Sequence, residues 1–200
     1  MRILSIHVFS LYKEKPIILS SAFSLSFISI FQRSTLKEFI NFHSRLVIER
    51  IQKETNAQVK LEKGICYALS NNDNIGYTMI CDEEYPKRVA IEFLLKISDN
   101  FKIFLAQNKI NLNNIDKDTD IKFDYIKNEI EEWQDPSKKD NLMKLQNELV
   151  EVQDIMRQNL EELLKREENL NDLIKKSEDL NAASKSFYIQ AKKTNKCCNM

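Results

Sequence analysis

Hydrophobic and polar residues alternate in short runs over the first part of the chain, which is typical of half-buried strands. The first run is RILSIHVFSLY (2–12), and a second strand candidate follows Pro16. Three more short strands are predicted in QVKLEKGICYALSNNDNIGYTMIC (58–81), where Gly64 and the cluster NNDNIG supply the turns. The pattern therefore predicts five strands.

Between and after these strands, apolar residues recur every three or four positions, as they do in amphipathic helices. One helix is predicted from an N-cap at Ser34 or Thr35 to residue 51, and another over residues 87–107. A further helix candidate covers residues 121–133. The element order β-β-α-β-β-β-α predicts an α+β fold in which helices pack on an antiparallel sheet.

Beyond Pro136 the chain contains neither Gly nor Pro, and its apolar residues follow alternating steps of three and four. Sixteen such positions keep register as far as Thr194 and eleven are apolar, which indicates the a/d seam of a coiled coil. A lone helix with such a seam is unstable in water, so this segment needs partner helices. Its main apolar seam positions are Leu142, Leu145, Leu149, Val152, Met156, Leu163, Leu170, Leu173, Leu180 and Phe187.

One seam position carries a charge, because Arg166 stands between Leu163 and Leu170. One interpretation is a tolerated residue whose long side chain reaches out to solvent. The other is a group that sets the register, since buried polar residues in coiled coils specify register and partner number at a cost in stability. Arginine suits that role because its planar guanidinium can donate to several carbonyl acceptors.

Composition narrows the classes of function. The 30 basic residues are balanced by 30 acidic ones, so no basic field favours nucleic acid as a partner. With two glycines the chain has no phosphate-binding glycine loop, and two histidines without a closely spaced cysteine pair disfavour zinc. No Cys-His or Ser-His-Asp arrangement indicates catalysis. Cys66 and Cys81 lie in apolar stretches and are predicted to be buried thiols.

No stretch of the sequence predicts a transmembrane helix. The uncharged segment 16–32 is too short to span a bilayer and contains five serines. The start of the chain also lacks the pattern of a signal peptide. The sequence therefore predicts a cytosolic protein unless a covalent group attaches it to a membrane.

Two parts of the chain resemble parts of one known family. Residues 162–188, ELLKREENLNDLIKKSEDLNAASKSFY, resemble the R-SNARE motif, with Arg166 at the central ionic layer that meets three glutamines of partner helices. Residues 1–130 are similar to the longin domain, a profilin-like five-stranded antiparallel sheet with helices on both faces. The segments FQRSTLKEF (31–39) and EEYPKRVAIEFL (83–94) resemble those of the prenylated longin R-SNAREs, which have no transmembrane anchor.

This resemblance implies the organisation and function of the whole chain. A linker (131–138) would join the longin domain to a long R-SNARE coiled-coil helix (139–196), followed by a prenylation motif (197–200). The implied function is that of an R-SNARE (v-SNARE), which drives docking and fusion of vesicles in ER–Golgi, endosomal or vacuolar transport by forming a four-helix bundle with Q-SNAREs. A longin-linked protein acyltransferase and a coiled-coil tether stay open as alternatives, although a tether has no need of Arg166.

The chain ends in TNKCCNM, which implies a lipid anchor and also departs from the family. Family members usually have three residues after the second cysteine, whereas only Asn199 and Met200 follow here. Cys197 would then head the CaaX box, take a prenyl group from a prenyltransferase and, given the final Met, favour farnesyl. Cys198 would take a second lipid, either palmitate or prenyl. No other cofactor is expected, and the protein would reside in the cytoplasm and on the cytosolic face of Golgi, vesicle and endosomal membranes.

Phe42 has two interpretations. The apolar stripe of its helix centres on Ile40, His43 and Val47, and Phe42 lies at the edge of that stripe, where aromatic residues commonly form the rim of a core. The resemblance adds that the longin surface at Phe39 and Phe42 is a groove where the folded-back SNARE segment and the prenyl group dock. We therefore expect a closed state in which Phe42 and its neighbours cover the lipid and part of the seam.

Overall fold

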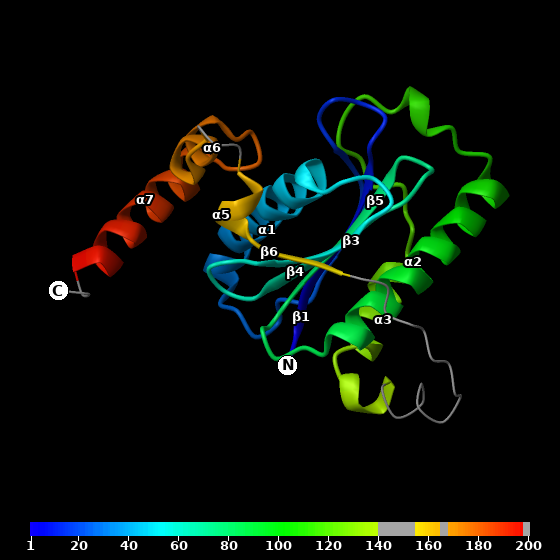
Figure 1. The fold of residues 1–200 in the computed structure, drawn as a ribbon, viewed down its shortest axis with the longest axis horizontal. Helices are drawn as coiled ribbons and strands as arrows, with labels where there is room; N and C mark the ends of the chain where they lie inside the picture. The colour runs from blue at the N-terminus through cyan, green and yellow to red at the C-terminus, as the bar shows by residue number, and fades with distance from the viewer. Residues whose placement is uncertain (140–154, 165–167, 198–200) are drawn as a thin grey trace.

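The computed structural model describes residues 1–139, 155–164 and 168–197 of the chain. A single sheet forms its centre, with one long helix on one face and two helices on the other (Figure 1). The C-terminal elements lie on the side of the first long helix. The arrangement confirms the predicted α+β class.

The first five strands form the expected antiparallel sheet, in the order β2-β1-β5-β4-β3. A sixth strand, β6 (Met156–Asn159), comes from the C-terminal segment and pairs in parallel with β3, from Ala57 opposite Met156 to Lys60 opposite Asn159. This strand was not predicted. The other strands are β1 (Ile3–Ser10), β2 (Ile17–Phe23), β3 (Asn56–Lys60), β4 (Ile65–Ser70) and β5 (Ile75–Cys81).

The helix on one face, α1 (Ile30–Arg50), starts earlier than its sequence pattern predicts. Its N-cap is Ser29, so the prediction of Ser34 or Thr35 as the N-cap is wrong. The amides of Gln32 and Arg33 bond to the carbonyl of Ser29, and these backbone bonds begin the helix without a side-chain cap. The polar residues that resemble a helix start therefore lie inside the first two turns.

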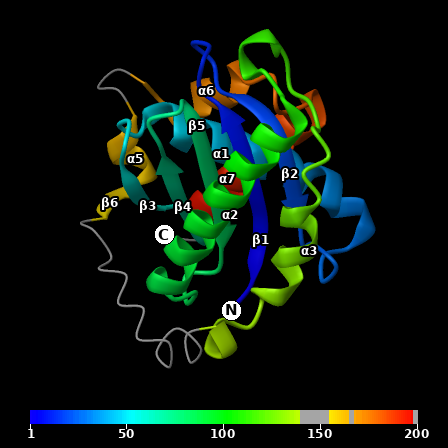
Figure 2. The ribbon, with the colours of Figure 1, turned by 90° about the vertical axis from the view of Figure 1, so that its right-hand side faces the viewer.

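The opposite face carries α2 (Lys87–Asn108) and α3 (Tyr125–Glu132), joined through a short helical turn η1 (Leu112–Asn114). Figure 2 shows α2 in front of the sheet with α3 beside it. The ring of Trp133 stacks on Phe93 of α2 with centroids 4.4 Å apart, and the Trp133 carbonyl accepts a bond from the Tyr85 hydroxyl at 2.7 Å. Trp133 thus packs in the core of the longin-like half, beyond the predicted boundary at residue 130.

The C-terminal segment does not form one long helix in this conformation. Its described residues form β6 and three helices, and the expected continuous coiled-coil helix is absent from them. The physical reason is that an isolated seam would leave its leucines in water, whereas the broken segment buries several of them on the first half. The three helices are α5 (Leu160–Leu163), α6 (Leu170–Lys176) and α7 (Ala182–Cys197).

Candidate functional site

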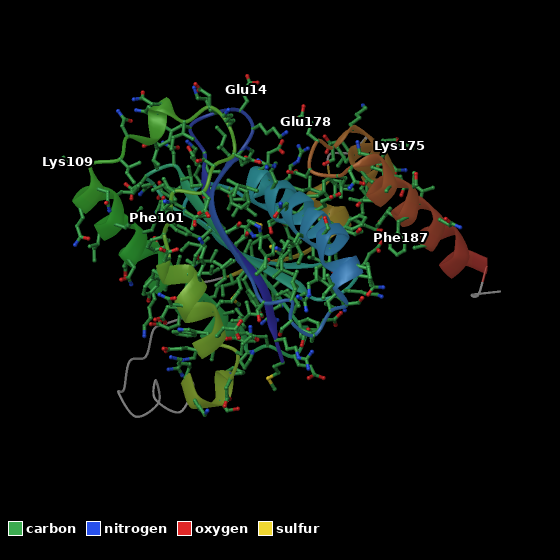
Figure 3. All side chains as sticks on the ribbon, turned by 180° about the vertical axis from the view of Figure 1, so that it is seen from behind. Glu14, Phe101, Lys109, Lys175, Glu178 and Phe187 are labelled. Carbon is green, nitrogen blue, oxygen red and sulfur yellow. The ribbon has the colours of Figure 1, made fainter. Side chains whose placement is uncertain are left out.

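The site of interest is the contact between the C-terminal segment and the face of the sheet covered by α1. Strand β6 extends the sheet at β3, and α5, α6 and α7 follow beside α1 (Figures 1 and 3). Figure 3 labels Glu178 between α6 and α7 and Phe187 on α7. Contacts here join residues that lie more than a hundred positions apart in the sequence.

Apolar side chains make up the centre of this contact. Four buried residues of the C-terminal segment share one cluster with α1 and the sheet, namely Leu160, Leu170, Ile174 and Leu180. On α1 the cluster contains Ile40, Phe42, Leu46 and Val47. Because burial of apolar surface contributes about 25 cal/mol per Å², such a cluster favours the folded-back arrangement strongly.

Phe42 is buried at the centre of this contact, with 5% of its surface exposed. Its ring meets the ring of His43 edge-on at 5.1 Å. It also lines a cleft of about 360 Å³ between α1 and the α6–α7 connection, together with Leu173 and Ser177. The other predicted groove residue, Phe39, is half-buried, and its ring centroid lies 5.6 Å from that of Tyr188 on α7. Both phenylalanines thus face the folded-back segment.

A buried arginine ties three parts of the chain together beside the cleft. Arg45 of α1 donates from Nη2 to Asp179 at 2.9 Å and to Asp118 at 2.6 Å, and its Nη1 donates to the carbonyl of Pro16. The side chains of Arg45 and Asp179 are 6% and 10% exposed. Burial lowers the pKa of Arg45, but its hydrogen bonds to the carboxylates of Asp179 and Asp118 outweigh burial and raise the pKa. The guanidinium therefore stays charged and satisfied.

Polar contacts surround this apolar centre. Arg50 at the end of α1 donates to Glu168 at 3.0 Å, and the Tyr188 hydroxyl donates to Glu62 at 3.0 Å. The side chain of Glu38 accepts two bonds from Asn181, one from its backbone amide and one from its side chain. These bonds fix the segment at two points along α1 and at the turn after β3.

The seam residues are distributed unevenly in this conformation. Leu170 and Leu180 are buried, Met156, Leu163 and Leu173 are half-buried, and Phe187 is 62% exposed. Two of the fully buried side chains, Leu160 and Ile174, are not seam residues, because each follows a seam position by one residue. Leu142, Leu145, Leu149, Val152 and Arg166 lie outside the described residues.

The contact with the first half therefore uses part of the seam, Leu170 and Leu180, together with a neighbouring face of the segment. Leu160 and Ile174 are fourteen positions apart, and Tyr188 follows Ile174 by another fourteen, so all three occupy the same heptad position next to the seam. Sequence reasoning missed this second apolar row. Its signal was the spacing of these three residues at two full heptads.

The lipidation residues can be placed only in part. Helix α7 ends at Cys197, and Cys198 lies outside the described residues. In the part of the chain that the structure describes, no helix is long and apolar enough to cross a bilayer. The prediction that Cys66 and Cys81 are buried free thiols is confirmed, and burial raises the pKa of both.

Both halves of the chain match known protein families. Residues 23–126 match the longin family, described as a regulated-SNARE-like domain, and residues 141–200 match the synaptobrevin family. A longin domain followed by a synaptobrevin segment places the chain in the class of longin-domain SNAREs.

Known proteins are similar in sequence to this chain over nearly its entire length. A synaptobrevin homolog YKT6 from Saccharomyces cerevisiae is 35% identical over 199 residues, which are 99% of this chain and 98% of the relative. The YKT6 homolog of Debaryomyces hansenii is 33% identical over 99% of this chain and 98% of its own length. The VAMP-like protein YKT61 of Arabidopsis thaliana is 33% identical over 92% of this chain and 91% of its own length. The chain belongs to the YKT6 family of longin-domain synaptobrevin homologs, which are R-SNAREs of vesicle transport.

Proposed function

We propose that this R-SNARE alternates between the closed form described above and an open form that assembles with partner SNAREs. The observation that carries the proposal is the burial of Leu170, Ile174 and Leu180 in the same cluster as Phe42. Leu170 and Leu180 belong to the seam, and while they are covered in this way they are not free to pack against partner helices. The closed form is therefore autoinhibited, and assembly requires the C-terminal segment to leave α1.

In the open form the partners are three Q-SNARE helices, and the family membership supports partners of this kind. The seam from Leu142 to Thr194 becomes one continuous helix in the four-helix bundle, with Arg166 in the central ionic layer facing glutamines. Burial of the seam supplies the free energy that pulls two membranes together. No bond is made or broken in this reaction.

Membrane attachment is covalent and reversible in this proposal. A prenyltransferase attaches the prenyl group to Cys197, and Cys198 takes a second lipid, palmitate or prenyl. A single prenyl chain binds membranes only marginally, so a second chain or a basic patch sets the strength of attachment. The protein divides between the cytoplasm and the cytosolic face of Golgi, vesicle and endosomal membranes.

Of the two alternatives, the acyltransferase receives less support. An acyltransferase that used a thiolate needs a cysteine of lowered pKa, whereas burial raises the pKa of Cys66 and Cys81. A tether would connect membranes without fusing them, and the folded-back segment does not distinguish a tether from a fusion protein. The distinction requires a fusion experiment.

The experiment is lipid mixing between two vesicle populations, one carrying the lipidated chain and one carrying Q-SNAREs. The proposal predicts lipid mixing that requires both populations and increases when the contact with α1 is weakened. Docking of the vesicles without lipid mixing would establish the tether. If a chain that is shown to bind the Q-SNARE helices gives no docking and no lipid mixing, a role in fusion is contradicted.

A further inference from the structure

Large apolar side chains are concentrated on the surface at the start of α1, away from the contact described above. Phe27 is 44% exposed, Ile30 is 76% exposed and Phe31 is 94% exposed. Apolar residues scattered singly over a surface are ordinary, but three within five consecutive residues are not. We call Phe27, Ile30 and Phe31 the apolar tip.

The apolar tip is held outward by its surroundings. Arg33 donates from Nε to the carbonyl of Ile28 and from Nη2 to that of Ser26, both at 2.8 Å, which fixes the loop before α1. At the start of this loop the buried Leu25 accepts a bond from the amide of Ile28 at 3.1 Å. The exposure of the tip is therefore part of the folded structure.

One cation lies over a ring of the apolar tip, and another lies over a ring at the end of β2. The guanidinium of Arg2 lies 4.4 Å from the centroid of the Phe27 ring, and the ammonium of Lys37 lies 5.1 Å from that of Phe23. From residue 16 to residue 37 the sequence contains no acidic residue. The nearest acid along the chain, Glu38, accepts bonds from Asn181. Aromatic and aliphatic side chains with basic residues beside them, in a segment without acidic residues, suit an anionic lipid bilayer.

The shape of the tip favours a lipid surface over a protein helix. A side chain that is 94% exposed, as Phe31 is, has almost no neighbours and projects from the surface instead of lining a groove. Figure 2 shows the start of α1, in blue, at the right-hand edge of the molecule. A projecting apolar side chain can enter the boundary between headgroups and acyl chains, whereas a helical partner requires a concave groove.

We propose that the apolar tip, together with Arg2, Arg33 and Lys37, is a membrane-contact site of the longin half. Phe27, Ile30 and Phe31 enter the headgroup region of an anionic bilayer, and the three cations attract its acidic lipids. The site would supply the second attachment that a protein with a marginal lipid anchor needs. This role as a second attachment rests on the proposed function, whereas the contact itself is tested on a chain without lipid.

The test uses the full chain without lipid, as the Cys197→Ser/Cys198→Ser protein. Its binding is measured by flotation with phosphatidylcholine vesicles that contain or lack phosphatidylserine. We expect binding to the phosphatidylserine vesicles that falls about tenfold or more in Ile30→Ser/Phe31→Ser, because full burial of such side chains changes partitioning by at least that factor. The matched control is Ile103→Ser on α2, which removes an apolar side chain that is 55% exposed and should leave binding unchanged.

A second readout follows insertion directly. Phe31→Trp should shift its emission to shorter wavelength on phosphatidylserine vesicles and not on vesicles of phosphatidylcholine alone. Circular dichroism and thermal melting check that each variant is folded, which is expected for side chains this exposed. Binding of Ile30→Ser/Phe31→Ser equal to that of the parent chain would overturn the proposal. A parent chain that does not bind the acidic vesicles would also overturn the proposal. The same holds if Ile30→Ser/Phe31→Ser loses only self-association and keeps its binding to vesicles.

Discussion

Arg45 is the residue whose charge joins the two halves, and its replacement gives a sharp prediction. Arg45→Met leaves Asp179, a carboxylate with only 10% exposure, without its cation. Loss of one partner of a buried ion pair typically costs about 3–5 kcal/mol, so the closed form should open. Limited proteolysis should cleave the C-terminal segment faster in this variant while residues 1–139 stay folded.

A double variant separates charge from packing at the same position. Arg45→Met/Asp179→Leu removes both charges, and hydrophobic replacement of a whole ion pair is often neutral. We therefore expect the double variant to recover much of the protease resistance that Arg45→Met loses. If both variants are cleaved equally fast, the Arg45–Asp179 pair does not hold the segment. Loss of the contact between Arg45 and Asp118, which both variants share, then accounts for the effect.

The buried imidazole of His7 should make the free energy of unfolding depend on pH. It is buried in β1, where its Nε2 lies 2.8 Å from Asn41 Oδ1, and burial is the main cause that lowers its pKa to about 4. Because the unfolded chain binds this proton at a higher pH than the folded chain, stability is complete above pH 6.5 and falls as the pH drops from 6.5 towards 4. The loss attributable to His7 reaches about 3 kcal/mol at most.

Urea unfolding at a series of pH values measures this dependence. His7→Gln keeps a side-chain donor for Asn41 but cannot titrate, so its stability should depend less on pH in the same range. His43, whose pKa burial also lowers, adds dependence in the same direction. Parallel pH profiles for the parent chain and His7→Gln would show that His7 does not titrate as described.

At the scale of elements, the strands and long helices followed from local patterns, and the conformation of the C-terminal segment did not. The spacing in residues 2–12 and 58–81 predicts strands from local pattern alone, although β4 and β5 are buried on both faces. Met156–Asn159 lies inside a heptad repeat, so its pattern indicates a helix, and it becomes a strand only because β3 offers an unpaired edge. Arg45 and Asp179 are separated by 134 positions, and no local signal relates them.

Two neighbouring residues of α6 should have opposite effects on assembly. Ile174 is fully buried against the first half, and Leu173 is a seam residue that is only half-buried. Ile174→Ala should weaken the closed form by about 2–4 kcal/mol and accelerate binding of Q-SNARE helices, because it leaves the seam intact. Leu173→Ala should instead weaken the assembled bundle.

Binding kinetics and bundle melting temperatures for these two variants provide the measurement. The two alanines stand on adjacent residues of one helix, and each replaces an aliphatic side chain of four carbons. Faster assembly for Leu173→Ala than for Ile174→Ala would contradict the assignment of the two faces.

The C-terminal end of α7 gives a prediction about attachment. Cys197→Ser should abolish prenyl labelling and release the protein from membranes, whereas Cys198→Ser should weaken or redistribute it. Metabolic labelling with prenyl and acyl analogues, followed by fractionation, measures both effects. Prenyl labelling that survives Cys197→Ser would disprove the assignment of Cys197 as the CaaX cysteine.

At the scale of the whole molecule, one sequence supports two structures. The closed form uses the row formed by Leu160, Ile174 and Tyr188 together with part of the seam, and the assembled form uses the complete seam. A ligand can shift this equilibrium only by its difference in affinity for the two forms. In the proposed function Q-SNARE helices bind only the open form, so the shift of the population depends on their concentration and on their affinity for the seam.

Hydrogen exchange of the backbone amides tests this account most directly. In the full chain without partners, the amides of β6 and α6 should exchange far more slowly than in an unfolded chain. Phe42→Glu should increase their exchange while the amides of β1 and β5 keep their protection. Exchange of β6 and α6 at the rate of an unfolded chain, in the parent protein without partners, would contradict the closed form and the autoinhibition proposed from it.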